Sequence, residues 1–296
     1  MRLRHIEVVH AIRVTGSLTA AAELLSLTQP AITQILQSAE RQLGYPLFYR
    51  VRGKLSPTKE ALRLFPEIHK LNNQLEAVQR LAENLRGGVD DSAVRVVAAP
   101  ALAQTIAADT AAAFARQYPA TKISLRADYS ATAVSNIALL EADIGILYHG
   151  VSHPAITEEV LAESRLVCVG PRSVLPSADA IDLAFLDGRE IIAPDPGDPL
   201  GRLLSETLHE RSLTVRTTIT GQSYHSLITL SARSGQITIV DEVSAITAKE
   251  LGLQVVPLRP AIAIPIVASV AISGERSVHT QRFVQICKDV LRACRS

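Results

Sequence analysis

The stretch that decides the fold runs from Thr15 to Arg52 and reads TGSLTAAAELLSLTQPAITQILQSAERQLGYPLFYRVR. Its second half has apolar residues at helical spacing, which predict a helix with one buried face: Ile32, Ile35, Leu36, Ala39 and Leu43. Thr28 stands where an N-cap belongs, and Pro30 lies in the first turn, where proline is tolerated. Because Gly44 suits the left-handed residue that ends a helix, we expect this helix between Thr28 and Gly44.

A shorter helix is expected before it, at residues 19–25. Its three consecutive alanines, Ala20–Ala22, would let another helix cross closely, and the link to Thr28 is short, as helix-turn-helix units require. After Gly44, residues 46–50 are typical of a strand and residues 52–54 of a cationic hairpin tip. The pattern predicts a winged helix-turn-helix. The alternative is a helical subdomain that only packs on another domain, but it gives the cationic tip no purpose.

The run AAELLSLTQPAITQILQSAERQLGYPLFYR resembles the N-terminal DNA-binding domain of LysR-type transcriptional regulators. The matching positions are the alanine pair before Glu23, Gln29-Pro30-Ala31, Glu40 with Leu43-Gly44, and Pro46-Leu47-Phe48 with Arg50. The resemblance implies contacts with double-stranded promoter DNA, in which the helix reads the major groove and the wing touches phosphates. The residues expected to bind DNA are Ser17, Thr19, Thr28, Gln29, Pro30, Thr33, Gln34, Gln37, Arg50, Arg52 and Lys54.

A long helix is expected next, with Thr58 as its N-cap. Its apolar residues follow steps of three and four, which is the spacing of a near-heptad seam: Ala61, Phe65, Ile68, Leu71, Leu75, Val78, Ala82 and Leu85. By resemblance this is the linker helix through which LysR-type subunits dimerise, and the family commonly forms a dimer of dimers. The alternative is that the seam packs on its own domain.

From residue 94 onward, short apolar strands alternate with helices, which indicates parallel βαβ units. We expect strands at 94–98, 122–127, 143–148, 166–169, 190–193, 215–220, 237–240 and 266–271, and helices at 103–118, 130–142, 200–211, 224–234 and 278–294. Two such α/β lobes, joined by crossing strands near Glu163 and Ile264, resemble a periplasmic-binding-protein fold, which is the effector domain of LysR-type regulators.

The expected fold is therefore an α+β multidomain chain. It has a winged helix-turn-helix at residues 1–58, a linker helix at 59–88 and an effector-binding domain at 89–296. Lobe I comprises about residues 93–163 and 266–296, and lobe II about residues 164–265.

In open α/β lobes, ligands bind beyond the carboxyl ends of strands, near helix N-termini. Free amides there favour a carboxylate, to which Arg202 could add charge, while acidic side chains could hold an ammonium or guanidinium group. The residues expected to bind the effector are Pro100, Ala101, Leu102, Tyr129, Ser130, Asp195, Asp198, Leu200, Gly201, Arg202, Ser223, His225 and Asp241. These groups together predict an amino-acid-like or carboxylate effector. The stretch Asp198–Leu203, with Ser223, Ser226 and the strand end at residues 239–241, also resembles regulators of opine and arginine-type amino-acid catabolism.

Charge is divided unevenly along the chain. Residues 1–88 hold 12 Lys and Arg against 7 Asp and Glu, and the remainder holds 18 against 22. The N-terminal 88 residues are thus basic and the rest of the chain is acidic, which favours a polyanionic partner for the N-terminal part only. No enzyme motif such as G-x-S-x-G, a Walker loop or H-E-x-x-H is present, so neither catalysis nor a cofactor is expected.

The three cysteines, Cys168, Cys287 and Cys294, have no metal-binding spacing, and no metal site is expected. The start, Met1–His5, predicts a helix rather than a signal peptide, and no apolar run is long enough to span a membrane. We expect a cytoplasmic regulator without membrane contact, and RNA polymerase as a possible further partner. The alternative is a solute-binding or redox-sensing protein of the same two-lobe fold.

Overall fold

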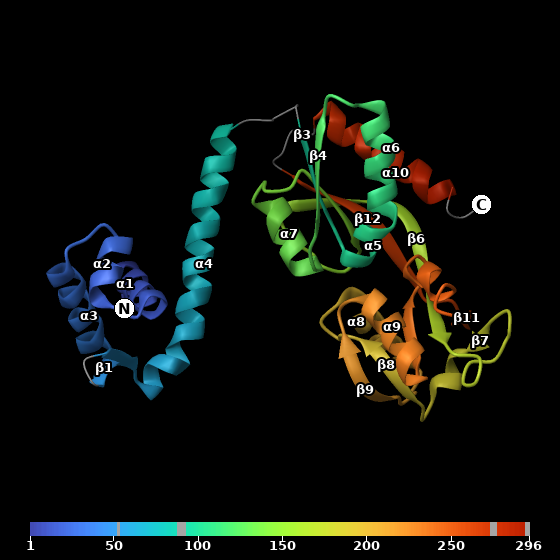
Figure 1. The fold of residues 1–296 in the computed structure, drawn as a ribbon, viewed down its shortest axis with the longest axis horizontal. Helices are drawn as coiled ribbons and strands as arrows, with labels where there is room; N and C mark the ends of the chain where they lie inside the picture. Colours follow the sequence, from blue (N-terminus) through green and yellow to red (C-terminus); the bar gives the residue numbers. More distant parts are fainter. Residues whose placement is uncertain (52–53, 88–92, 273–276, 294–296) are drawn as a thin grey trace. The chain divides into compact units, whose positions relative to one another are not determined.

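The computed structural model describes residues 1–51, 54–87, 93–272 and 277–293 (Figure 1). The chain divides into two compact units, Met1–Glu83 and Asn84–Ser296. This division falls inside one helix, α4 (Lys59–Gly87), and not at the domain boundaries expected from the sequence. The described helices include none that is both long and apolar enough to cross a membrane.

The first unit begins with three helices, α1 (Leu3–Thr15), α2 (Leu18–Leu24) and α3 (Gln29–Leu43). The antiparallel hairpin of β1 (Phe48–Val51) and β2 (Lys54–Pro57) follows them. The local signals act as expected: Thr28 holds the N-cap position in an extended conformation, and Gly44 ends α3 with a φ of 81°. The winged helix-turn-helix is present.

Two hydrogen bonds fix the hairpin to α3. The Glu40 carboxylate, near the end of α3, accepts hydrogen bonds from the backbone amides of Leu47 (2.7 Å) and Phe48 (3.3 Å). A charged acceptor that takes two backbone donors makes strong hydrogen bonds, so the hairpin starts in a defined position beside the helix.

Helix α4 begins as part of this unit. Thr58 caps it, since its hydroxyl accepts from the amide of Ala61 at 3.1 Å. Phe65 and Ile68 are buried in the same core as Ile12, Ile32 and Leu47 of the first unit: this core consists of Val8, Val9, Ala11, Ile12, Ala21, Ala22, Ile32, Leu36, Leu47, Ala61, Phe65 and Ile68. The first part of the expected seam therefore packs on its own domain.

The second unit begins with β3 (Ala93–Ala98), α5 (Pro100–Gln104), α6 (Ile106–Gln117), β4 (Lys122–Ala127), α7 (Ser130–Ala138), β5 (Ile144–Tyr148) and β6 (Ile156–Gly170). It continues with β7 (Ile181–Asp182), the 3₁₀ helix η1 (Leu183–Leu186), β8 (Glu190–Pro194), α8 (Pro199–Glu210), β9 (Arg216–Gly221), α9 (Tyr224–Ser234) and β10 (Ile237–Asp241). The 3₁₀ helix η2 (Ser244–Ala248), β11 (Gln254–Arg259), β12 (Ala263–Ala271) and α10 (Val278–Ala293) complete it.

These strands form one continuous sheet in the order β4-β3-β5-β12-β6-β10-β8-β9, with β11 paired to β6. The long strand β6 joins two lobes, because its first part pairs with β12 and its last residues pair with β10 and β11. Strands β6 and β12 cross between the lobes near Glu163 and Ile264, as expected, with Pro265 opposite Glu163 and Ile264 opposite Ser164. Helices α6 and α10 lie side by side on lobe I (Figure 1).

Three expected elements differ from the structure. The helix expected at 103–118 is two helices, because Thr105 leaves helical geometry (φ −123°, ψ −98°) and Pro100 starts the first of them. The helix expected at 130–142 ends at Ala138, before Leu140 adopts a φ of 57°. The strand expected at 166–169 is only the end of β6, and β11 was not expected, since Pro257 interrupts its pattern.

Candidate functional site

The exposed face of α3 is the candidate DNA interface. Pro30, Gln34, Gln37 and Arg41 lie exposed at steps of four, three and four residues, which places them on one stripe of the helix. The opposite face, with Ile32, is buried. The stripe offers two side-chain amides and a guanidinium, groups that hydrogen-bond to base edges and phosphates.

The residues that precede and flank this stripe are also at the surface. Thr28 and Gln29 are exposed, and the Gln29 amide donates to the Thr33 hydroxyl at 3.0 Å. Ser17 caps α2 by accepting from the amide of Ala20 at 3.5 Å, and Thr19 is exposed in the first turn of this helix. These positions are compatible with DNA contacts, which stay predictions.

The expected phosphate contacts lie on the wing. Arg50 is exposed on β1. Lys54 begins β2, but its side chain lies outside the described part of the chain, and Arg52 falls wholly outside it. The contribution of these cations to DNA binding therefore stays a prediction.

The candidate effector site lies where the two lobes meet, around Asp198 at the N-cap of α8. Asp198 accepts hydrogen bonds from the Leu200 amide (3.3 Å) and from the Tyr224 hydroxyl at the start of α9. The Tyr224 ring packs 5.9 Å from the ring of Tyr148, which ends β5 of lobe I. Burial raises the pKa of Asp198, while the hydrogen bond from Tyr224 opposes this shift.

Arg202 connects the lobes at the same place. Its guanidinium, on α8 of lobe II, donates to the backbone carbonyl of Gly150, which follows β5 of lobe I. Arg202 is exposed, and its positive charge partly opposes the rise that burial causes in the pKa of Asp198, so the two groups interact electrostatically. A cation and a carboxylate therefore stand together at the lobe junction.

The Asp241 carboxylate is buried and serves the packing of lobe II. It is fully buried at the end of β10 and accepts from the hydroxyls of Ser164 (3.0 Å) and Ser244 and from the Val243 amide (3.1 Å). Burial raises its pKa. The Tyr148 hydroxyl is buried nearby and has no hydrogen-bond partner of normal geometry within the described residues. Because its oxygens are already engaged, Asp241 ties β6 to η2 rather than presenting a carboxylate to a ligand.

The other expected effector residues divide by exposure. Tyr129, Arg202 and His225 are exposed, whereas Pro100, Ala101, Asp195, Asp198 and Ser223 are half-buried. The Asp195 carboxylate accepts from the Gly197 amide (2.7 Å), and Ser223 caps α9. Ser130 is buried at the start of α7, and Leu102 and Leu200 are fully buried in the core. Burial favours a packing role for the two leucines and corrects their assignment to the ligand surface.

Gly201 is required by close packing. A Cβ atom there would stand 2.0 Å from the backbone oxygen of Asp195, a distance no real contact allows. We expect Gly201→Ala to destabilise the effector domain by about 1–3 kcal/mol or more, since the backbone must move. Urea unfolding measures the loss. Gly221→Ala is the matched control, because its Cβ would meet only the end of the Leu227 side chain, at 2.9 Å, and no backbone atom. Equal stability of the two variants would contradict this role.

No group of three or more potential metal ligands occurs among the described residues. Family comparison identifies the chain. Residues 3–62 match the model described as "Bacterial regulatory helix-turn-helix protein, lysR family", and residues 87–292 match "LysR substrate binding domain". The chain belongs to the LysR family. The LysR-type prediction is thereby confirmed, including its two-domain fold, and the chain is a DNA-binding transcriptional regulator and not an enzyme.

Relatives within the LysR family match most of the chain. The HTH-type transcriptional regulator DgcR of Pseudoalteromonas sp is 34% identical over 83% of this chain and 84% of its own length. The octopine catabolism/uptake operon regulatory protein OccR of Rhizobium meliloti is 29% identical over 84% and 83%. The regulatory protein NocR of Agrobacterium fabrum is 27% identical over 82% and 81%.

Solved LysR-type structures share the fold. Full-length BenM superposes with a TM-score of 0.58 at 19% identity and covers 99% of this chain and 97% of its own. Full-length CbnR in complex with its target DNA has a TM-score of 0.56 at 17% identity, covering 98% and 99%. At identities of 17–19%, these similarities show a shared fold and nothing about the ligand.

Proposed function

We propose that this LysR-type regulator binds promoter DNA as a homo-oligomer and responds to an amino-acid-like effector held at the lobe junction. One observation supports this class of effector. The Arg202 guanidinium donates a hydrogen bond to the Gly150 carbonyl of the other lobe and also interacts electrostatically with the Asp198 carboxylate. The guanidinium and the carboxylate both lie at the start of α8 in lobe II, and the guanidinium also reaches the Gly150 carbonyl of lobe I. A zwitterionic ligand carries the same two charges and could exchange for this pair.

The polar groups around the junction suit such a ligand. Its carboxylate would interact with Arg202 and with the free amides at the start of α7, near Ser130. Its ammonium or guanidinium group would interact with Asp195 and Asp198, which remain partly exposed. One relative, OccR, is named for octopine catabolism and uptake, and octopine is an arginine derivative, which supports an arginine-derived effector.

Calorimetry on the full chain with arginine, ornithine and opine-like compounds tests this proposal. We expect saturable binding that Arg202→Gln weakens about tenfold or more, since a charged hydrogen bond is lost. Arg211→Gln, an exposed change at the other end of α8, is the matched control and should bind normally. If none of these compounds binds while an aromatic acid or a neutral metabolite does, the effector class is wrong and the regulator assignment stands.

Ligand binding would act through β6 and β12, which cross between the lobes. A ligand that touches both lobes shifts their arrangement only as far as its affinities for the two arrangements differ. In a dimer of dimers, such a change would alter the spacing of the DNA-binding heads and hence DNA bending. A cytoplasmic location, contact with RNA polymerase and the domain limits 1–58, 59–88 and 89–296 belong to the same proposal.

A redox-sensing function is disfavoured by the two described cysteines. Burial raises the pKa of the Cys168 thiol to about 12 and that of Cys287 to about 11, which suppresses the reactive thiolate. We expect a Cys294→Ser variant, which removes the cysteine outside the described residues, to react with Ellman's reagent only after unfolding in urea. Rapid labelling of that variant in its native state would revive the redox alternative.

A further inference from the structure

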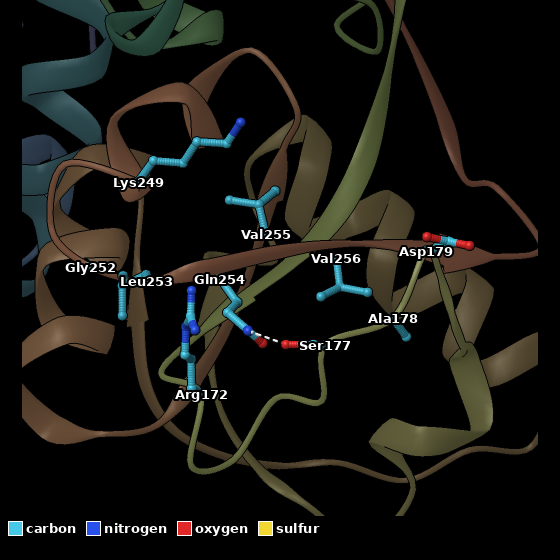
Figure 2. A pocket seen from close by; sticks show the side chains of 10 residues that line it. All are labelled: Arg172, Ser177, Ala178, Asp179, Lys249, Gly252, Leu253, Gln254, Val255 and Val256. Carbon is cyan, nitrogen blue, oxygen red and sulfur yellow. Dashed lines mark hydrogen bonds between the residues drawn. The ribbon is translucent and has the colours of Figure 1, made fainter.

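The described residues that line the hollow beside β11 in lobe II do not converge on a ligand. The hollow has a volume of about 610 Å³, and Figure 2 shows its two cationic side chains, Arg172 and Lys249, pointing apart. The Gln254 amide donates to the Ser177 hydroxyl at 2.5 Å, and its oxygen is buried where a molecule in the hollow would not meet it. The polar groups of the lobe junction, in contrast, converge on one carboxylate, that of Asp198.

The two oxygens of the Asp198 carboxylate have different surroundings. Oδ2 accepts hydrogen bonds from the Tyr224 hydroxyl and, at 3.3 Å, from the Leu200 amide. Oδ1 accepts none from the described residues, yet it is not one of the buried polar atoms that lack a partner, so it reaches solvent. The protein therefore fixes one oxygen and leaves the other open to a donor from outside.

Within the described part of the chain, Asp198 forms no ion pair. The Arg202 guanidinium donates to the Gly150 carbonyl instead. Burial and, to a smaller extent, the neighbouring Asp195 raise the pKa of Asp198, whereas the hydrogen bonds from Tyr224 and the Leu200 amide and the charge of Arg202 oppose this rise. A half-buried carboxylate with one open oxygen suits the ammonium or guanidinium group of a ligand.

The fold holds the Tyr224 hydroxyl in place and out of water. Tyr224 begins α9 of lobe II and is 4% exposed, and the ring of Tyr148 from lobe I packs 5.9 Å from its ring. Burial, together with the charge of Asp198, raises the pKa of Tyr224, so this hydroxyl stays protonated and donates to the carboxylate. A hydrogen bond that is shielded from water in this way is strong.

We infer that Tyr224 is a positioning residue of the effector site: its hydroxyl holds Oδ2 of Asp198 and keeps the carboxylate ionised, so that Oδ1 receives the cationic group of the effector. This inference rests on the proposed amino-acid-like effector and gives it an orientation. The ammonium or guanidinium group meets Asp198, and the carboxylate meets Arg202.

Carbon-13 NMR of the full-length protein, labelled at the aspartate side-chain carboxyls, follows the titration of Asp198 without any ligand, and Asp198→Asn assigns its signal. We expect Tyr224→Phe to move this titration to higher pH, because a hydrogen bond that favours the charged form is lost while burial still disfavours that form. Tyr148→Phe is the matched control. It removes the other tyrosine hydroxyl of the junction, which has no hydrogen-bond partner of normal geometry among the described residues, and should leave the Asp198 titration in place.

Calorimetry with arginine and ornithine then measures what Tyr224 does for binding. Tyr224→Phe should weaken binding about tenfold at neutral pH, since a hydrogen bond to a charged group is lost. The loss should be smaller at mildly alkaline pH, where Asp198 ionises without the tyrosine. Thermal unfolding checks that both variants are folded.

An Asp198 titration that Tyr224→Phe leaves unchanged, or that Tyr148→Phe moves as far, would overturn the role of Tyr224. So would arginine binding that Tyr224→Phe weakens equally at every pH. If neither amino acid binds while Tyr224→Phe still moves the titration, the proposed effector fails and the positioning of Asp198 by Tyr224 stands.

Discussion

Replacing Leu71 and Leu75 with glutamate is expected to halve the mass of the smallest stable assembly and to reduce operator affinity at least about 100-fold. In α4, the residues Leu71, Leu75, Val78, Ala82 and Leu85 follow steps of four, three, four and three. Leu71, Val78 and Leu85 are 47%, 64% and 60% exposed. Such a stripe of apolar side chains at heptad spacing is the pattern of a helix that pairs with another.

The large loss of operator affinity is expected because α4 would link two helix-turn-helix domains. Two linked recognition helices bind two half-sites with an avidity that commonly exceeds single-site affinity by about 10²–10⁴. Light scattering gives the mass, and titration of a labelled operator gives the affinity. Leu62→Glu is the matched control, because Leu62 is also exposed on α4 (58%) but lies off the seam. An unchanged mass for the double variant would count against subunit pairing through α4.

Only the second part of the apolar seam predicted for α4 is free to pair with another subunit in the structure. The heptad pattern runs without interruption from Ala61 to Leu85, so periodicity alone cannot tell which members meet a partner and which meet their own domain. Phe65 and Ile68 are buried in the helix-turn-helix core. Of the large apolar residues of the seam, Leu71, Val78 and Leu85 remain exposed. That distinction depends on tertiary packing.

Local signals made the DNA-binding unit predictable. The N-cap position of Thr28, the early Pro30 and the stop at Gly44 act within a few residues of one another, and α3 begins and ends accordingly. The hydrogen bonds of Glu40 to the wing lack such a signal, since a glutamate in an amphipathic helix ordinarily faces solvent.

The lobe junction was predictable only in outline. The sequence pattern placed Asp198 and Arg202 at a helix start, where the structure has them, but it did not give their partners, because Tyr224 and Gly150 are distant in sequence. Asp241 stood at a strand end like the others, and only its bonds to Ser164 and Ser244 reveal its structural position.

Gln34→Ala is expected to weaken binding to the operator by about 5- to 150-fold while leaving affinity for bulk DNA nearly unchanged. Gln34 is exposed in the middle of the stripe formed by Pro30, Gln37 and Arg41. A glutamine amide can read the edge of adenine in the major groove, and such a contact contributes about 1–3 kcal/mol of discrimination against other bases. Alanine keeps the helix intact, because it has the best helical propensity.

The comparison that decides the role of Gln34 is with Arg50→Gln on the wing. Arg50 is exposed on β1 and is expected to contact phosphate, so its loss should weaken operator and bulk DNA alike. It should also reduce the slope of log affinity against log salt by about one. Fluorescence anisotropy at several salt concentrations, with operator and scrambled duplexes, measures both quantities. Equal losses on the two duplexes for Gln34→Ala would show that α3 does not read sequence through this side chain.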